Sequence, residues 1–373
     1  MNLTTVSYGK PGQVSSPLRR VMNSWTLLTG VVLVSASCSD SNEPSLLDSG
    51  SANGPDASDT PEDAGARDAE VADAQIPVEP EWSYVSAFTL EASCGATNLG
   101  SIACWGADYS LNDPPIIVGP PAPDDPAFGV MMQYMEGRAA ILCGLSVDNR
   151  VFCWGNRDLG LVPLASGESA VAITVNRAVC WLDEDGFGQC RTSDNPDSAG
   201  VTEATMPTDI VFEQISLGLR YGCGIRADTR AIECWGDDLF NVAGFEPDGE
   251  FLDIATGNTH ACAVDVDQNL ICWGARDVAA SEQKPTEAVT DVVIEGASTC
   301  ARLAADQRWV CWNRETSATS RKLREETPDR PDIENVSVAG THACGETPDG
   351  WICWGDNSEC QLDIPDPATI SPP

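Results

Sequence analysis

Short runs in which apolar and polar residues alternate recur along the chain from Glu81 onward. Phe251–Thr256 and Ile333–Val338 are two such runs; both are rich in β-branched residues, and glycine follows each of them closely. A period of two places successive side chains on opposite faces, which is the pattern of a half-buried β-strand. Pairs such as Asp185-Gly186 separate one run from the next. The sequence therefore predicts strands joined by tight hairpin turns.

One unit of this pattern occurs seven times and repeats about every 42 residues. It consists of an alternating run, a cysteine, a polar turn, a second alternating run and a second cysteine, which Trp-Gly usually follows. A period of this length is typical of propeller blades or of helical solenoid pairs, and the strand pattern favours the propeller. We therefore predict an all-β fold, a seven-bladed β-propeller of four-stranded sheets, over residues 81–373.

Cysteines occur in pairs along these units, and every unit contains both members of its pair. This regularity indicates bonding within each unit, across the hairpin. Zinc fingers require cysteines two to four residues apart and redox motifs require Cys-x-x-Cys, and neither spacing occurs within the pairs. A disulfide closing a loop of about ten residues stabilises a fold by roughly 2 to 3 kcal/mol. The predicted structural disulfides are Cys94–Cys104, Cys143–Cys153, Cys180–Cys190, Cys223–Cys234, Cys262–Cys272, Cys300–Cys311 and Cys344–Cys353.

Two units carry the residues of a known repeat. The fifth reads Ala-Thr-Gly-Asn-Thr-His260-Ala-Cys-Ala-Val and then Leu-Ile-Cys-Trp-Gly, and the seventh reads Val-Ala-Gly-Thr-His342-Ala-Cys-Gly and then Trp-Ile-Cys-Trp-Gly-Asp-Asn. These segments resemble repeats of the regulator of chromosome condensation family, and the resemblance spans nearly all of residues 82–365. It implies a seven-bladed β-propeller. The third unit departs from the pattern, with Arg191 in place of the Trp-Gly, and WD-type repeats are the second choice because their sequence marks lie farther apart.

The N-terminal part differs in composition from the repeats. Arg19 and Arg20 precede an apolar stretch that ends in Val-Ser-Ala-Ser-Cys38, so residues 1–38 resemble a signal peptide with a bacterial lipoprotein box. Two interpretations remain open, lipidation of Cys38 or ordinary cleavage after Ala36. Residues 39–80 contain eleven Asp and Glu against one basic residue, which predicts a disordered acidic linker.

Charge and cysteine content exclude some functions. The formal net charge is -36, and such a polyanion is repelled by phosphate backbones, so we expect no nucleic-acid partner. Sixteen cysteines indicate an oxidising compartment. We expect an exported protein, either secreted or anchored in the cell envelope, that contacts the membrane only through its lipid.

Histidines, an extra cysteine and recurrent tryptophans are the residues of the repeats that are candidates for catalysis or binding. His260 and His342 each lie two residues before a first cysteine, at a position that varies between units, so we interpret them as packing or inter-blade hydrogen-bonding residues. Cys360 stands outside the seven pairs and is interpreted as a buried free thiol or an intermolecular link. The tryptophans that follow the second cysteines are expected to pack between blades; they are Trp105, Trp154, Trp235, Trp273, Trp312 and Trp354.

The hairpin turns share an aspartate. Because a propeller places all these turns on one face, they would form an acidic ring there, although aspartate is also a common turn residue for local reasons. A segment around Asp265 faintly resembles a calcium loop but lacks its glycine and closing glutamate. The ring residues are Asp148, Asp185, Asp228, Asp267, Asp306 and Asp349.

The sequence therefore predicts a function class. We expect an extracytoplasmic, monomeric binding or scaffold protein without cofactor, metal or catalysis, whose loops bind an unidentified protein or a polysaccharide. In the resembled family, the role of a secreted β-lactamase inhibitor fits this compartment best. The alternative is a propeller lyase or glycan hydrolase acting in the central channel. We also expect the strand around Trp82–Phe88 to close the ring by pairing with the segment near Leu362.

Overall fold

The computed structural model describes residues 79–89, 92–106, 130–138, 141–155, 170–176, 178–192, 205–237, 240–275, 283–313 and 318–370. The predicted signal segment 1–38, with Cys38, lies outside these residues, and so does the predicted linker 39–80 apart from Glu79 and Pro80. Among the described residues, no helix combines the length and apolar character needed to cross a bilayer.

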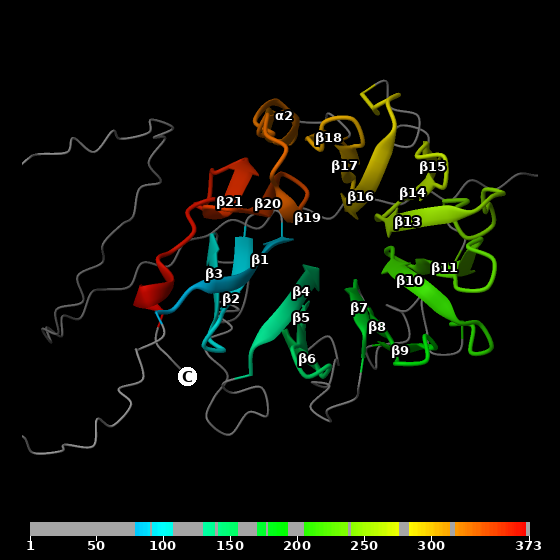
Figure 1. Ribbon diagram of the computed structural model, residues 1–373, viewed down its shortest axis with the longest axis horizontal. Helices are drawn as coiled ribbons and strands as arrows, with labels where there is room; N and C mark the ends of the chain where they lie inside the picture. Colours follow the sequence, from blue (N-terminus) through cyan, green and yellow to red (C-terminus); the bar gives the residue numbers. More distant parts are fainter. Residues whose placement is uncertain are drawn as a thin grey trace, which may run out of the picture. The chain divides into compact units, whose positions relative to one another are not determined.

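The described residues form seven antiparallel sheets of three strands each, and these sheets are the blades of a seven-bladed β-propeller (Figure 1). Each blade uses three consecutive strands in chain order. In blades 1 to 4 the strands are β1 (Trp82–Thr89), β2 (Ala92–Thr97) and β3 (Ile102–Gly106); β4 (Met132–Arg138), β5 (Ile141–Ser146) and β6 (Val151–Gly155); β7 (Ala172–Val175), β8 (Ala178–Leu182) and β9 (Gly188–Thr192); and β10 (Phe212–Leu217), β11 (Tyr221–Arg226) and β12 (Ile232–Gly236).

Blades 5 to 7 repeat this arrangement and close the ring next to blade 1 (Figure 1). The predicted number of blades is confirmed, but each sheet has three strands among the described residues, where four were expected. In these blades the strands are β13 (Phe251–Thr256), β14 (His260–Asp265) and β15 (Leu270–Gly274); β16 (Val289–Glu295), β17 (Ser298–Leu303) and β18 (Trp309–Asn313); and β19 (Glu334–Val338), β20 (His342–Thr347) and β21 (Gly350–Gly355).

Each blade carries one disulfide between its second and third strands, as the cysteine pairs predicted. The two cysteines are direct cross-strand partners; in blade 5, for example, Cys262 faces Cys272 with their Cα atoms 4.0 Å apart. Opposite residues on paired strands come this close because the strands are hydrogen-bonded neighbours. The same hairpin register therefore brings the two cysteines of every blade within bonding distance.

The joints between blades are built from a disulfide on one blade and a tryptophan on the next. Cys262 and Cys272 of blade 5 share a core cluster with Trp312 of blade 6, and Trp354 of blade 7 packs in the cluster that holds the blade 6 disulfide. Sulfur packs favourably against aromatic rings. The predicted packing of these tryptophans between blades is thus observed at the joints that the clusters describe.

Blade 3 lacks this tryptophan, and another residue takes its place. Arg191 follows the second cysteine, and its guanidinium lies 6.0 Å from the ring of Trp181. Trp181 is 2% exposed and belongs to the core cluster that contains the blade 2 disulfide, Cys143–Cys153. Trp181 can replace the missing tryptophan because it lies on the same face of the sheet. Val179 is the cross-strand partner of Arg191, and Trp181 lies two residues after Val179 on the same strand.

Two helices of the described residues lie outside the blades. Helix α2 (Ala318–Glu325) follows β18 and was not foreseen by the strand pattern; it buries Leu323 in the cluster between blades 6 and 7. A short 3-10 helix, η3 (Pro367–Thr369), begins at Asp366, whose side chain accepts a hydrogen bond from the Ala368 N–H at 2.9 Å.

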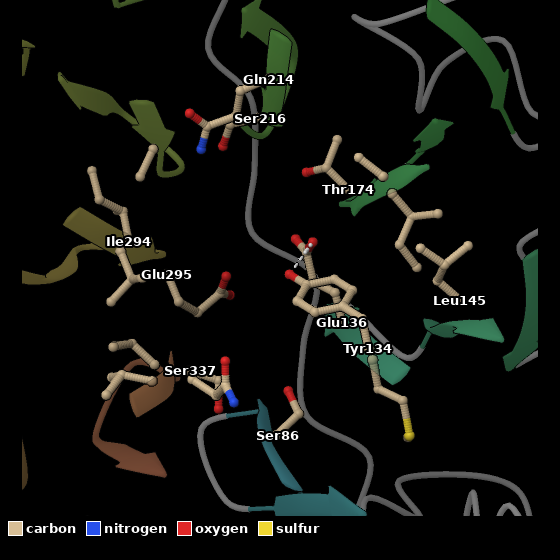
Figure 2. Close-up of a pocket in the computed structure, with 18 of the residues that line it drawn as sticks. Ser86, Tyr134, Glu136, Leu145, Thr174, Gln214, Ser216, Ile294, Glu295 and Ser337 are labelled. Carbon is tan, nitrogen blue, oxygen red and sulfur yellow. Dashed lines mark hydrogen bonds between the residues drawn. The ribbon is translucent and has the colours of Figure 1, made fainter. Parts of the chain in front are cut away.

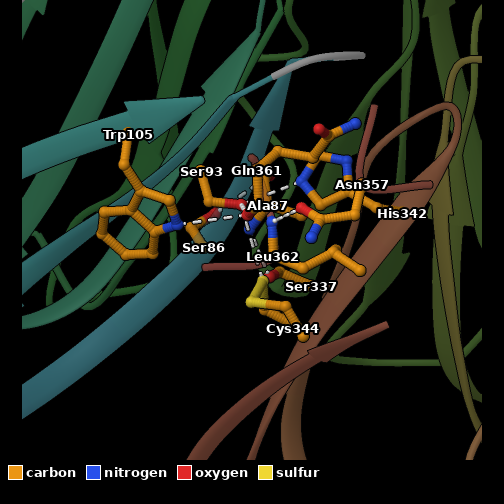
Figure 3. The surroundings of a disulfide bond; sticks show 11 residues. Ser86, Ala87, Ser93, Trp105, Ser337, His342, Cys344, Asn357, Gln361 and Leu362 are labelled. Carbon is orange, nitrogen blue, oxygen red and sulfur yellow. Dashed lines mark hydrogen bonds between the residues drawn. A yellow bond between two sulfur atoms is a disulfide. The ribbon is translucent and has the colours of Figure 1, made fainter. Parts of the chain in front are cut away.

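Side chains of blade 1 donate hydrogen bonds to the C-terminal segment where the ring closes, and Figure 3 shows Ser93 and Trp105 beside Gln361. Within the described residues β1 pairs with β2 and with no other strand, and the segment near Leu362 is not a strand, so the predicted pairing is wrong. This segment instead supplies backbone carbonyls to blade 1. The Gln361 carbonyl accepts from Ser93 Oγ at 2.9 Å and from Trp105 Nε1 at 3.1 Å, and the Pro365 carbonyl accepts from Trp82 Nε1 at 2.9 Å.

Candidate functional site

The sequence analysis indicates two candidate regions, the central channel and the face formed by the hairpin turns. The channel is a cavity of about 570 Å³ lined by the first strand of every blade. Register explains which side chains line it, because the residue opposite the first cysteine of each unit faces the axis. In blade order these channel residues are Ser86, Glu136, Thr174, Ser216, Ala255, Val293 and Ser337.

Four of these seven channel residues carry a hydroxyl group, and three of the hydroxyls, those of Thr174, Ser216 and Ser337, accept a hydrogen bond from a backbone N–H of the next blade. Thr174 Oγ1 accepts from the Leu217 N–H at 3.1 Å, and Ser337 Oγ accepts from the Ala87 N–H at 2.8 Å. In each pair the acceptor belongs to one blade and the donor to the first strand of the next. These first strands are sheet edges, and unpaired edge N–H groups are costly when buried. The hydroxyls therefore satisfy the inner edges and join the blades.

A second layer of polar side chains repeats this arrangement nearer the turns. Gln214 Oε1 accepts from the Ile254 N–H at 3.2 Å, and Asp253 Oδ2 accepts from the Val292 N–H at 2.7 Å. Burial raises the pKa of Asp253 above its ordinary value, although hydrogen bonds from Gln214 and from Val292 oppose this rise. Asp253 is thus a joint residue whose charge is partly desolvated.

The carboxylates of the channel are Glu136, Glu213 and Glu295, and none of the described lining residues is Lys, Arg or His. Figure 2 shows the side chains of Glu136 and Glu295 pointing into the channel. Tyr134 donates its hydroxyl to Glu136 Oε2 at 3.1 Å. Burial raises the pKa of the neighbouring Tyr84, with Glu136 adding to the rise, so this phenol stays protonated at neutral pH. The channel alternative for catalysis would have to work with carboxylates and phenols.

The two histidines occupy joints. His260 Nε2 lies 2.9 Å from Thr299 Oγ1 of the next blade, and His342 Nε2 lies 2.9 Å from Ser93 Oγ of blade 1. Both imidazoles are fully buried. The interpretation of these residues as inter-blade hydrogen-bonding groups is confirmed. Cys360 is disulfide-bonded, so the expectation of a free thiol is wrong.

We call the hairpin turns between the second and third strands, together with the residues that begin each first strand, the turn face. Backbone hydrogen bonds hold the two parts together: the Val147 N–H donates to the Met131 carbonyl at 3.1 Å, and the Val266 N–H donates to the Glu250 carbonyl at 3.0 Å. Turn and strand start therefore form one surface in each blade.

The turns also connect successive blades. Asn149 and Gln268 have φ values of 64° and 65°, and the same turn position in blade 3 is glycine. This left-handed conformation directs their carbonyls to the next blade, where Ala170 N–H donates to Asn149 at 2.7 Å and Val289 N–H donates to Gln268 at 2.9 Å. The turn face is therefore a continuous, hydrogen-bonded rim over these blades.

All six ring aspartates occupy these turns, but several of them are paired with arginine. Asp228 accepts from Arg226 Nε at 3.0 Å, and this hydrogen bond lowers the pKa of Asp228 to about 2. Asp148 has Arg150 at 2.6 Å, Asp306 has Arg308 at 2.7 Å, and Asp349 has Arg330 at 4.0 Å. The ring is therefore not uniformly acidic.

The remaining two ring residues, Asp185 and Asp267, lie in turns organised by a preceding aspartate. Asp183 Oδ1 accepts from the Asp185 N–H at 3.0 Å, and Asp265 Oδ1 accepts from the Asp267 N–H at 2.9 Å. Aspartate has this role in many turns. Within the described part of the chain, no group of three or more His, Cys, Asp or Glu is arranged to hold a metal ion.

No protein-family model matches the chain. Solved structures of propellers do match it. The ectodomain of the receptor kinase CR4 from Physcomitrella patens is 21% identical, covers 73% of this chain and 72% of its own, and has a TM-score of 0.55. The CRINKLY WD40 ectodomain of the Arabidopsis thaliana receptor kinase ACR4 is 19% identical, covers 76% and 98%, and has a TM-score of 0.57. These likenesses show the propeller fold of the chain.

Proposed function

We propose that the protein is an extracytoplasmic scaffold that binds another protein through the turn face. The single observation that carries this proposal is that the polar groups at the axis and joints differ in role from those of the exposed turns. The hydroxyls and both histidines at the axis and joints hold the blades together, while the exposed turns differ from blade to blade. A rigid scaffold with variable surface loops is the usual basis of binding by propellers.

The disulfides support an extracytoplasmic location. Seven cross-strand disulfides are typical of proteins in oxidising compartments outside the cytosol. We include in the proposal that residues 1–38 direct export and that residues 39–80 are an acidic linker. Mass spectrometry of the mature N-terminus from the native host tests this part: cleavage within residues 36–38 supports export, whether or not Cys38 carries a lipid, and a chain that still begins at residue 1 contradicts it.

Affinity capture tests the binding function. The full chain, oxidised and immobilised, is incubated with the envelope and secreted fractions of the native host, and the retained material is identified by mass spectrometry. Chain with its disulfides reduced and alkylated is the control. We expect one dominant protein that the control does not retain. Retention of polysaccharide without protein would instead favour the glycan-active alternative in the channel, where Glu136, Glu213 and Glu295 provide the carboxylates.

A further inference from the structure

Large apolar side chains are exposed on one arc of the turn face. Val147 is 53% exposed and Val266 is 46% exposed, and further members lie at the same rim. The Phe187 backbone forms a β-bridge with Val211 of the next blade, which continues the arc from blade 3 to blade 4. We call this set the apolar arc; it covers blades 2 to 5 and comprises Met131, Val147, Val171, Phe187, Val211, Leu252 and Val266.

The repeats themselves show that two of these side chains, Val147 and Val266, are not required by the hairpin that carries them. Val147 and Val266 each lie four residues after the first cysteine of their blade, and the same position holds Asn98, Ala227 and Ala304 in blades 1, 4 and 6. All five residues sit in the same hairpin between the second and third strands. Because small or polar residues occupy this position in other blades, the hairpin does not require valine there. Clustered exposed apolar groups usually mark contact with another molecule.

Charge narrows the choice of partner. The turn of blade 3 carries Asp183, Glu184 and Asp185, the turn of blade 5 carries Asp265 and Asp267, and neither turn contains a basic residue. The turns of blades 2 and 4, on the same arc, instead pair Asp148 with Arg150 and Asp228 with Arg226, so the excess of negative charge along the arc lies at blades 3 and 5. A second copy of the chain would bring like charges together, and anionic lipid or nucleic acid would be repelled for the same reason. A surface with cationic side chains around an apolar centre complements both features.

We propose that the apolar arc binds a protein segment in which lysine or arginine flanks aromatic or aliphatic residues. This inference rests on the proposed function and specifies its face and the chemistry of its partner. The apolar side chains supply affinity by desolvation at the centre, and the carboxylates select the cationic flanks.

A random peptide library displayed on phage tests the proposal against the immobilised full chain. The arc variant carries Val147→Ser, Val171→Ser and Val266→Ser, and the control variant carries Phe240→Ser and Phe245→Ser. The two control residues are exposed to a similar degree, at 36% and 51%, but lie between β12 and β13, outside the arc. Unchanged melting temperatures establish that both variants fold.

We expect selected peptides to combine Lys or Arg with Trp, Phe or Leu. A labelled peptide should bind the arc variant at least tenfold more weakly in fluorescence anisotropy, and the control variant within twofold of the unaltered chain. Raising NaCl from low to high concentration should weaken binding several-fold. Selection of acidic peptides, or binding that survives in the arc variant, overturns this inference but leaves the proposed function intact. If neither a peptide nor a host protein binds the chain, the proposed function fails as well.

Discussion

The joint between blades 5 and 6 and the joint between blades 7 and 1 use the same hydrogen bond but differ in what surrounds it. At the first, His260 meets Thr299; at the second, His342 meets Ser93. The closing joint alone adds the C-terminal segment, whose Gln361 carbonyl also accepts from Ser93 (Figure 3). Consecutive blades are joined by the chain itself, whereas the first and last are not. The comparison shows that extra contacts from the C-terminal segment join blades 7 and 1, which no continuous stretch of chain connects.

Removing residues 361–373 should have the largest effect. The deletion leaves Trp82, Trp105 and Ser93 without the carbonyls to which they donate. Each lost hydrogen bond costs about 1–1.5 kcal/mol, and the loss is larger at the fully buried Ser93, so the melting temperature should fall by about 10 °C. Differential scanning calorimetry measures this fall. Deletion of residues 366–373, which keeps all three contacts, is the matched control, and equal melting temperatures for the two deletions would refute the assigned closing contacts.

Tryptophan substitutions compare packing at the two joints. Trp312 is 1% exposed in the joint between blades 5 and 6, while Trp105 is half-buried at the closing joint. Trp312→Ala should destabilise the fold by about 3–5 kcal/mol, because it creates a cavity that cannot collapse against a disulfide. Trp105→Ala should cost less. Urea denaturation of the two variants measures the order, and a larger loss for Trp105→Ala would contradict it.

Histidine substitutions should have a smaller effect and should sharpen the comparison. His260→Ala removes the side chain that bonds Thr299, whereas after His342→Ala the Ser93 hydroxyl still donates to Gln361. The first substitution should therefore destabilise by about 1 kcal/mol more than the second. When His342→Ala is combined with the 361–373 deletion, Ser93 loses both His342 and the Gln361 carbonyl, so the combined loss of stability should exceed the sum of the two single losses in a double-mutant cycle. Strict additivity would show that Ser93 does not couple the two contacts.

The smallest expected effect is a dependence on pH at the joint between blades 5 and 6. Burial raises the folded-state pKa of Asp253 above its ordinary value of 3.8, so folding favours the protonated acid. Its contribution to stability is therefore fully present below the unfolded pKa and is lost as pH rises through the folded pKa. Asp253→Asn removes this dependence. The unfolding free energy of the unaltered chain, relative to the variant, should decline as pH rises above about 4, and parallel curves would contradict the assignment.

The repeat pattern contained most of the fold. Strand positions, seven blades and all seven disulfides follow from local alternation and from cysteines that recur in register, because a hairpin brings its cross-strand partners together whatever surrounds it. Helix α2 was missed because its residues, Ala318–Glu325, follow no recurring pattern. Trp181 was missed as a joint residue because it occupies a different position from the other tryptophans and substitutes for them only through the shared sheet face.

The candidate functional regions were harder to predict from the sequence than the fold. A signal for the channel existed, since its residues lie six to eight positions before each first cysteine, but the hairpin register had to be known before that spacing could be used. The acidic ring was expected from the turns. Its division into arginine-paired aspartates, such as Asp228, and turn-forming pairs, such as Asp265 with Asp267, depends on side-chain contacts.

The sequence by itself determined the blades, because each blade is a local hairpin with an added strand and its contacts lie close along the chain. Only the tertiary structure decided how the ring closes, which polar groups are consumed in joining blades, and which turns present the apolar arc. These depend on contacts between residues far apart in sequence, such as Ser93 with Gln361, whose partners are chosen by the geometry of the closed ring.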